Sequence, residues 1–153
     1  MRYRRTVVGL VLVLATSSLS FKCGGGQTPD DPVRKAAKAA DAIAGSITEM
    51  IKVKRQLAQQ KTITPEEELA LTNALLKANT ADKAFLAATK QLKGTPTGDQ
   101  KSNLKTLFSA VSAAVNEVDA GVLGVKNPEA KTKLTTILNT IKASLAVISS
   151  LTQ

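Results

Sequence analysis

The chain reads TPEEELALTNAL over residues 64–75, and this stretch holds its clearest helix start. Thr64 and Glu67 have the spacing of a capping box, in which each side chain accepts a hydrogen bond from the other residue's backbone N–H. Pro65 presets the backbone of the first turn, and three successive glutamates complement the positive end of the helix dipole. We therefore expect a helix that begins at Thr64.

The apolar residues that follow this start recur every three or four positions, which is the spacing of one helix face. They are Leu71, Leu75, Ala78, Phe85 and Leu92, with Leu69, Leu76 and Leu86 alongside. Gly94 is a typical residue for a helix end, and Pro96 follows it. The pattern predicts an amphipathic helix from Thr64 to about Gly94.

Three further segments show the same periodicity with defined ends. The first opens with Asp31-Pro32 and ends near Gln60, where Lys52, Lys54, Arg55 and Lys61 complement the dipole. The third runs from about Asp99 to Asp119 and is closed by Gly121, and the fourth runs from Asn127-Pro128-Glu129 to the C-terminus. Gly45 in the first segment indicates a close helix–helix approach or a kink.

Four amphipathic helices joined by short links predict an all-α fold, an up-down-up-down antiparallel four-helix bundle over residues 31–153. We expect the third and fourth helices to share one dry seam. Its predicted members are Leu107, Phe108, Val111 and Val115, packed against Ile137, Ile141, Leu145 and Ile148. The apolar link between these helices, residues 122–125, should fold over the end of the bundle.

The residues before the bundle predict export. Residues 1–22 begin with three arginines within five residues, continue with an apolar run over 7–15 and then turn to small residues, as in a signal peptide. That apolar run is about half of the roughly 20 residues that a membrane-spanning helix needs. Residues 23–30 read as a flexible tether that contains three successive glycines.

Cys23 followed by Gly24-Gly25-Gly26 resembles the start of a bacterial lipoprotein. The resemblance implies that the cysteine is lipidated and that the tether spaces the bundle from a membrane. It covers only about the first 30 residues and departs from the family's lipobox, with Ser20 where leucine is usual and Lys22 where a small residue is usual. The alternative is cleavage after Ser20, which would give a secreted or periplasmic protein with a free thiol.

The composition argues against reactive chemistry. The chain has no histidine and only one cysteine, so zinc sites of Cys and His, haem ligation by His and intramolecular disulfides are excluded. The acids of residues 66–68 occupy consecutive helical positions that face different directions, so they suit the helix dipole better than one metal ion. We expect no catalytic residues, no cofactor and no metal.

The formal charge of +9 falls to +5 (17 − 12) once Arg2, Arg4, Arg5 and Lys22 are removed with the leader. The remaining charges are spread along the chain without an aromatic platform, so we expect no nucleic-acid partner. An ordinary solvated surface is the simplest interpretation, and loose attraction to anionic lipid or cell-wall polymer is the alternative.

These features together predict a non-enzymatic cell-envelope lipoprotein. The bundle would be a helical interaction or structural module, held at a membrane through Cys23, whose protein partner the sequence does not identify. The alternative from a different class is a secreted or periplasmic helical carrier that binds an apolar ligand or lipid.

Overall fold

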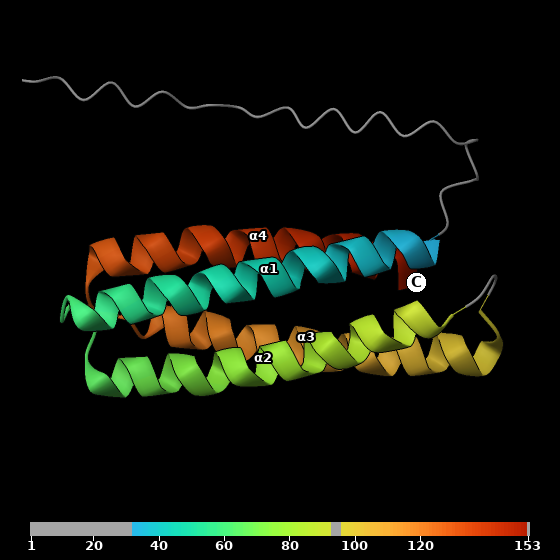
Figure 1. The fold of residues 1–153 in the computed structure, drawn as a ribbon, viewed down its shortest axis with the longest axis horizontal. Coiled ribbons are helices and arrows are strands. Elements are labelled where there is room, and N and C mark those ends of the chain that lie inside the picture. Colours follow the sequence, from blue (N-terminus) through green and yellow to red (C-terminus); the bar gives the residue numbers. More distant parts are fainter. Residues whose placement is uncertain (1–31, 93–95, 153) are drawn as a thin grey trace, which may run out of the picture.

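The computed structural model describes residues 32–92 and 96–152, and these residues form four helices (Figure 1). The helices are α1 (Pro32–Gln59), α2 (Pro65–Gln91), α3 (Gly98–Leu123) and α4 (Pro128–Thr152). Each runs antiparallel to its neighbour in the sequence (Figure 1). The predicted all-α, up-down-up-down four-helix bundle is confirmed, while the predicted signal peptide and tether lie outside the described residues.

Two of the predicted helix starts are made by the expected side chains. The backbone N–H of Thr64 donates to Glu67 Oε2 at 2.8 Å, and the N–H of Glu67 donates to Thr64 Oγ1 at 3.2 Å. At the start of α4, Asn127 Oδ1 accepts from the backbone N–H of Ala130 at 3.0 Å. These bonds satisfy helix N–H groups that have no partner within the helix.

The third helix starts where the sequence indicates but extends further at its C-terminal end. It begins after Thr97, which forms a second capping box with Gln100, and it continues through Gly121 to Leu123. Gly121 is therefore not the terminator that we expected. A Cβ atom at this position would lie 3.2 Å from Leu71 Cδ2, so the glycine allows α3 to approach α2 closely.

The glycine of α1 has no such role. Gly45 lies on the exposed side of the helix, and a Cβ atom placed there would meet nothing within 4 Å. The predicted close approach at Gly45 is therefore wrong. Helix packing depends instead on Gly121 of α3, which the sequence pattern had indicated as a helix end.

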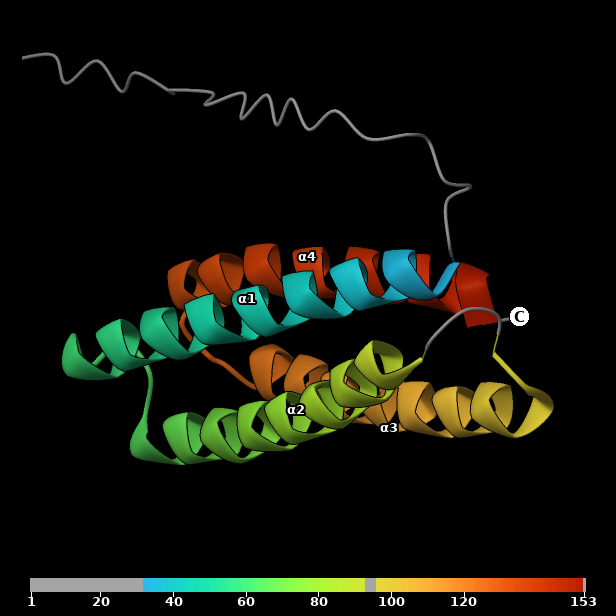
Figure 2. The same cartoon turned by 45° about the vertical axis from the view of Figure 1, so that its right-hand side comes forward.

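The four helices form a ring of neighbours with two dominant pairs (Figures 1 and 2). The α1·α4 and α2·α3 contacts are the most extensive, α1·α2 comes next and α3·α4 is the weakest. Within the described residues, the backbones of the diagonal pairs, α1·α3 and α2·α4, do not contact each other. The bundle is therefore best described as two helix pairs laid on each other.

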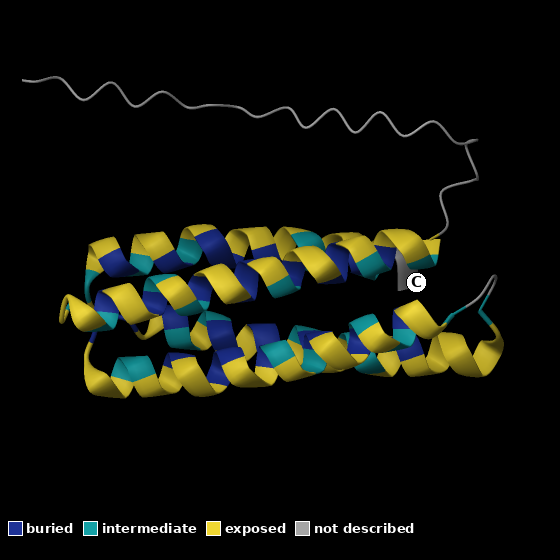
Figure 3. Cartoon of the chain, in the orientation of Figure 1, coloured by how far each residue is buried: buried dark blue, intermediate teal, exposed yellow. Residues whose placement is uncertain are grey.

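Buried positions face inward along all four helices (Figure 3). The largest fully buried side chains include Ile43 of α1, Phe85 of α2, Val111 of α3 and Ile141 of α4, and the buried residues of all four helices form one continuous core. The predicted α3·α4 seam is only partly dry, because Leu107, Phe108 and Leu145 are half-buried while its other five members are buried. The reason is that α3 packs mainly on α2, as the Phe85 and Phe108 rings show with centroids 6.3 Å apart.

Two short links, residues 60–64 and 124–127, cover one end of the bundle, which we call the closed end. The first link joins α1 to α2, and the second joins α3 to α4. Ile63 and Val125 from these links are both buried. Glu67 joins the links, because its Oε1 accepts from the backbone N–H of Lys126 at 2.9 Å. The predicted folding of residues 122–125 over the bundle end is confirmed at Val122 and Val125, whereas Leu123 points to solvent.

Candidate functional site

The predicted lipidation site, Cys23, lies outside the described residues. The structure does, however, place the start of α1 at the end of the bundle opposite the two closing links (Figure 1). Eight residues separate Cys23 from Pro32, the first residue of α1. Any anchor at Cys23 would therefore hold the bundle by that end.

The most unusual side chain of the described residues is Asp82, in the middle of α2. It is 0% exposed, and neither of its carboxylate oxygens has a hydrogen-bond partner. Buried polar groups are nearly always hydrogen-bonded, and an ionised carboxylate without a partner is costly to bury. Asp82 is therefore the best candidate for a residue kept for a reason other than stability.

The surroundings of Asp82 favour its neutral form. Burial raises the pKa of Asp82 to about 7, and the negative charge of Asp41 on α1 acts in the same direction. Asp41 itself lies 3.8 Å from Lys90 Nζ. The facing part of α3, residues 106–116, contains no charged side chain that could stabilise the ionised form. Asp82 thus holds a proton up to near-neutral pH, in a place that water does not reach.

A second charged side chain, Lys54 of α1, is buried with only 6% exposure. Its Nζ donates to Thr72 Oγ1 at 2.5 Å and lies 3.4 Å from a Glu68 carboxylate oxygen on α2. This lysine ties α1 to α2 near the closed end, so its predicted role at the helix dipole is replaced by an interhelical one. Because both its hydrogen bond and its charge are matched, Lys54 has a structural role that Asp82 lacks.

Both buried charges fall on the heptad-like spacing of a core stripe. Lys54 continues the series Ile43, Ile47, Met50, and Asp82 lies between Ala78 and Phe85. The apolar members of each stripe do not point to Asp82, and the sequence pattern assigned Lys54 to the helix dipole alone. A charged residue at a predicted core position was the signal that could have identified both.

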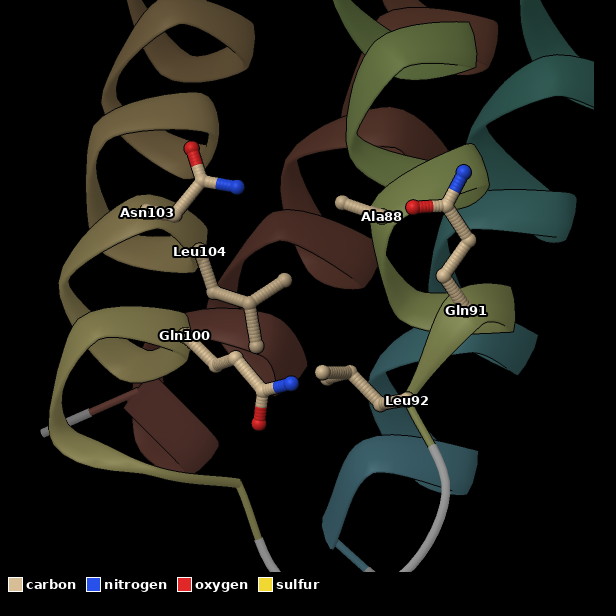
Figure 4. A pocket seen from close by; sticks show the side chains of 6 residues that line it. All are labelled: Ala88, Gln91, Leu92, Gln100, Asn103 and Leu104. Atoms are coloured by element: carbon tan, nitrogen blue, oxygen red, sulfur yellow. The ribbon is translucent and has the colours of Figure 1, made fainter.

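One shallow pocket of about 190 Å³ lies between the end of α2 and the start of α3 (Figure 4). Leu92 and Leu104 line it together with the amides of Gln91, Gln100 and Asn103, and Ala88 completes the wall. Gln100 already uses its side-chain oxygen in the Thr97 cap. None of the described residues that line the pocket is charged.

The described residues contain no group of three or more His, Cys, Asp or Glu side chains that could hold a metal ion. Within the same residues, none of the four helices combines the length and the apolar character that crossing a membrane requires.

Comparison with known proteins identifies no relative. No protein-family model, no curated protein and no solved structure matches this chain significantly. The function must therefore be argued from the chain's own residues.

Proposed function

We propose that this protein is a non-enzymatic cell-envelope lipoprotein, in which a four-helix bundle serves as an interaction or structural module tethered to a membrane through Cys23. The observation that carries the proposal is the order of features along the chain. A leader of signal-peptide type runs directly into a cysteine, a glycine-rich spacer and, nine residues after Cys23, the first residue of a folded bundle. That order is what a tethered domain requires.

The described surface supports a structural role over catalysis. Most charged side chains outside the core are exposed, and several form interhelical pairs at the surface, such as Lys77 with Glu117 at 2.6 Å and Lys142 with Asp119 at 2.8 Å. Exposed pairs of this kind contribute little to stability but keep a surface soluble. Asp82, the carboxyl group among the described residues whose pKa is raised, is sealed in the core and cannot reach a substrate in this conformation.

The test of the anchor is the Cys23→Ser variant, expressed in a bacterial host with the leader intact. The native protein should partition into detergent and sediment with membranes, because acyl chains bury apolar surface in the bilayer. The variant should move to the soluble fraction, and intact mass should show an acyl adduct on the native chain only. Thr28→Ala, in the same tether, is the matched control and should behave as the native protein.

Membrane association that is unchanged in Cys23→Ser would contradict the lipoprotein assignment. It would mean that the apolar run of the leader remains as the anchor. A native chain with an unmodified free thiol and a soluble location would instead favour simple secretion.

The second candidate function is a carrier whose bundle opens to hold an apolar ligand or lipid. Two observations favour it: Asp82 has no partner in the closed core, and the α3·α4 contact is the weakest of the ring. An opened bundle would give the Asp82 carboxyl access to water or to a polar headgroup.

A titration with a fluorescent fatty acid separates the two functions. For the structural module we expect no saturable binding and no change in the melting temperature. A carrier would bind about one ligand per chain and would be stabilised in proportion to ligand concentration, because a ligand that binds only the native state shifts unfolding by mass action. Such a result would place the carrier ahead.

A further inference from the structure

The charges that look scattered along the sequence are distributed unevenly over the bundle. We divide each helix at its midpoint and call the half that contains the start of α1, described residues 32–45, 79–92, 96–110 and 141–152, the basic end. It holds eight basic and three acidic residues, whereas the opposite half, which contains the two closing links, holds eight basic and seven acidic residues. The basic residues of the basic end are Arg34, Lys35, Lys38, Lys83, Lys90, Lys101, Lys105 and Lys142.

The three acids of the basic end do little to neutralise it. Asp82 is fully buried and keeps its proton up to about neutral pH. Asp41 makes one loose pair with Lys90 at 3.8 Å, and Asp99 lies in the first turn of α3. Among the described residues, none of the following exposed cations has a carboxylate within ion-pair distance: Arg34, Lys38, Lys83, Lys101 and Lys105.

The opposite half is neutralised by pairs within and between its helices. Lys54 pairs with Glu68, Lys77 with Glu117, and Lys133 with Glu129. The excess positive charge of the described residues is therefore concentrated at the end that contains the start of α1 (Figure 1).

The tether limits how far this end can move from its anchor. Nine residue steps lead from Cys23 to Pro32, and a fully extended chain of that length reaches about 30 Å. A flexible glycine-rich chain has a root-mean-square span of only about 17 Å. A lipid at Cys23 would thus keep the basic end, and not the closed end, close to the bilayer.

We propose that the basic end is a docking surface for an anionic phospholipid membrane, on which the bundle stands end-on with its closed end directed away from the bilayer. The orientation relative to the anchor rests on the proposed function, but the surface itself does not. Lysine and arginine side chains near an anionic bilayer each strengthen partitioning by about fivefold, and the attraction decays over a Debye length of about 10 Å at 0.1 M salt. Basic residues of this kind are the second signal that makes attachment by an acyl chain stable.

The test uses the chain from residue 23 onward with Cys23→Ser, so that no acyl group contributes to binding. Sedimentation with vesicles of equal parts phosphatidylglycerol and phosphatidylcholine is compared with sedimentation with pure phosphatidylcholine vesicles. We expect at least about tenfold stronger partitioning to the anionic vesicles at low salt, and its loss at about 0.5 M salt.

Two matched variants locate the surface, and each removes four exposed positive charges. Replacement of Lys38, Lys83, Lys101 and Lys105 by glutamine should lower anionic partitioning at least about tenfold. Replacement of Lys52, Arg55, Lys61 and Lys126 by glutamine, in the opposite half, should lower it by less than about threefold. Circular dichroism of both variants confirms that the bundle is intact.

Equal losses in the two variants would overturn the proposal, because binding would then follow net charge and not the basic end. The absence of any preference for anionic vesicles would overturn it as well, and would leave the lipidation of Cys23 untouched. Binding to an anionic cell-wall polymer but not to vesicles would also count against it. Whether Cys23 is lipidated is tested separately, by the intact mass and the detergent partitioning of the native chain.

Discussion

Between about pH 4 and pH 7, the free energy of unfolding of this protein should fall by about 4 kcal/mol because of Asp82 alone. The pKa of Asp82 rises from 3.8 to about 7 on folding, mainly through burial and to a smaller extent through Asp41. Each pKa unit corresponds to about 1.36 kcal/mol. Since a small domain has only about 5–15 kcal/mol in total, this is a large effect.

The direction follows from proton binding. In this pH window the native state keeps the proton on Asp82 whereas the unfolded state has lost it, so rising pH favours unfolding. Below about pH 4 both states are protonated and above about pH 7 both are ionised, so the contribution of Asp82 is constant outside the window.

Asp82→Asn removes this titration and keeps nearly the same shape. The variant should match the wild type at pH 4 and be up to about 4 kcal/mol more stable at pH 8, as measured by urea denaturation at a series of pH values. The difference between the two curves isolates Asp82 from every other titrating group. Asn73→Ala, at an exposed and uncharged position of α2, is the matched control, because it changes no titrating group.

A difference curve for Asp82→Asn that is also flat between pH 4 and pH 7 would contradict the prediction. It would mean that water or a rearranged side chain solvates the carboxylate in solution. In that case the core around Asp82 opens readily, and the carrier would gain support.

Phe85→Ala should lower the free energy of unfolding by about 3–5 kcal/mol, the range for a buried aromatic residue truncated to alanine. Phe85 is fully buried in α2 and contacts the ring of Phe108 at a tilt of 58°. The substitution removes buried apolar area and leaves a cavity among helices that cannot close over it completely. Phe108→Ala should cost less than half as much, because Phe108 is only half-buried.

Leu76→Ala provides the control for burial within the same helix. Leu76 is 63% exposed, so its truncation should change stability by less than about 0.5 kcal/mol. Thermal denaturation of the three variants at one pH measures all of these effects. Equal losses for Phe85→Ala and Phe108→Ala would show that α3 turns its apolar face further inward than the structure describes.

Much of the fold could be predicted from local chemistry. The capping box of Thr64 and Glu67 and the cap at Asn127 act within one turn, so the residues that make them are adjacent in the sequence. The same holds for the apolar spacing that gives each helix its buried face. The number of helices, their approximate bounds and their antiparallel order followed from these signals and from the short links between them.

Other features depended on which helix faces which. Apolar spacing identifies a buried face but not its partner, so it predicted an α3·α4 seam where the structure pairs α3 with α2 and α4 with α1. Gly121 illustrates the same limit. Whether a glycine ends a helix or admits a neighbour depends on the side chain opposite, here Leu71.

The candidate sites differ in whether the sequence alone or only the tertiary structure points to them. Cys23 can be proposed as a lipidation site from the sequence alone, because the pattern that suggests it, a cysteine between a leader-like segment and three glycines, is local. The isolation of Asp82 and the pairing of Lys54 depended on tertiary structure, because they follow from what lies across the interface. The basic end also depended on tertiary structure. Residues 34–38, 83–90 and 101–105 are distant in the chain, and only the antiparallel packing of α1, α2 and α3 brings their charges to one end of the molecule, since electrostatic potential depends on distance in space and not on separation along the sequence.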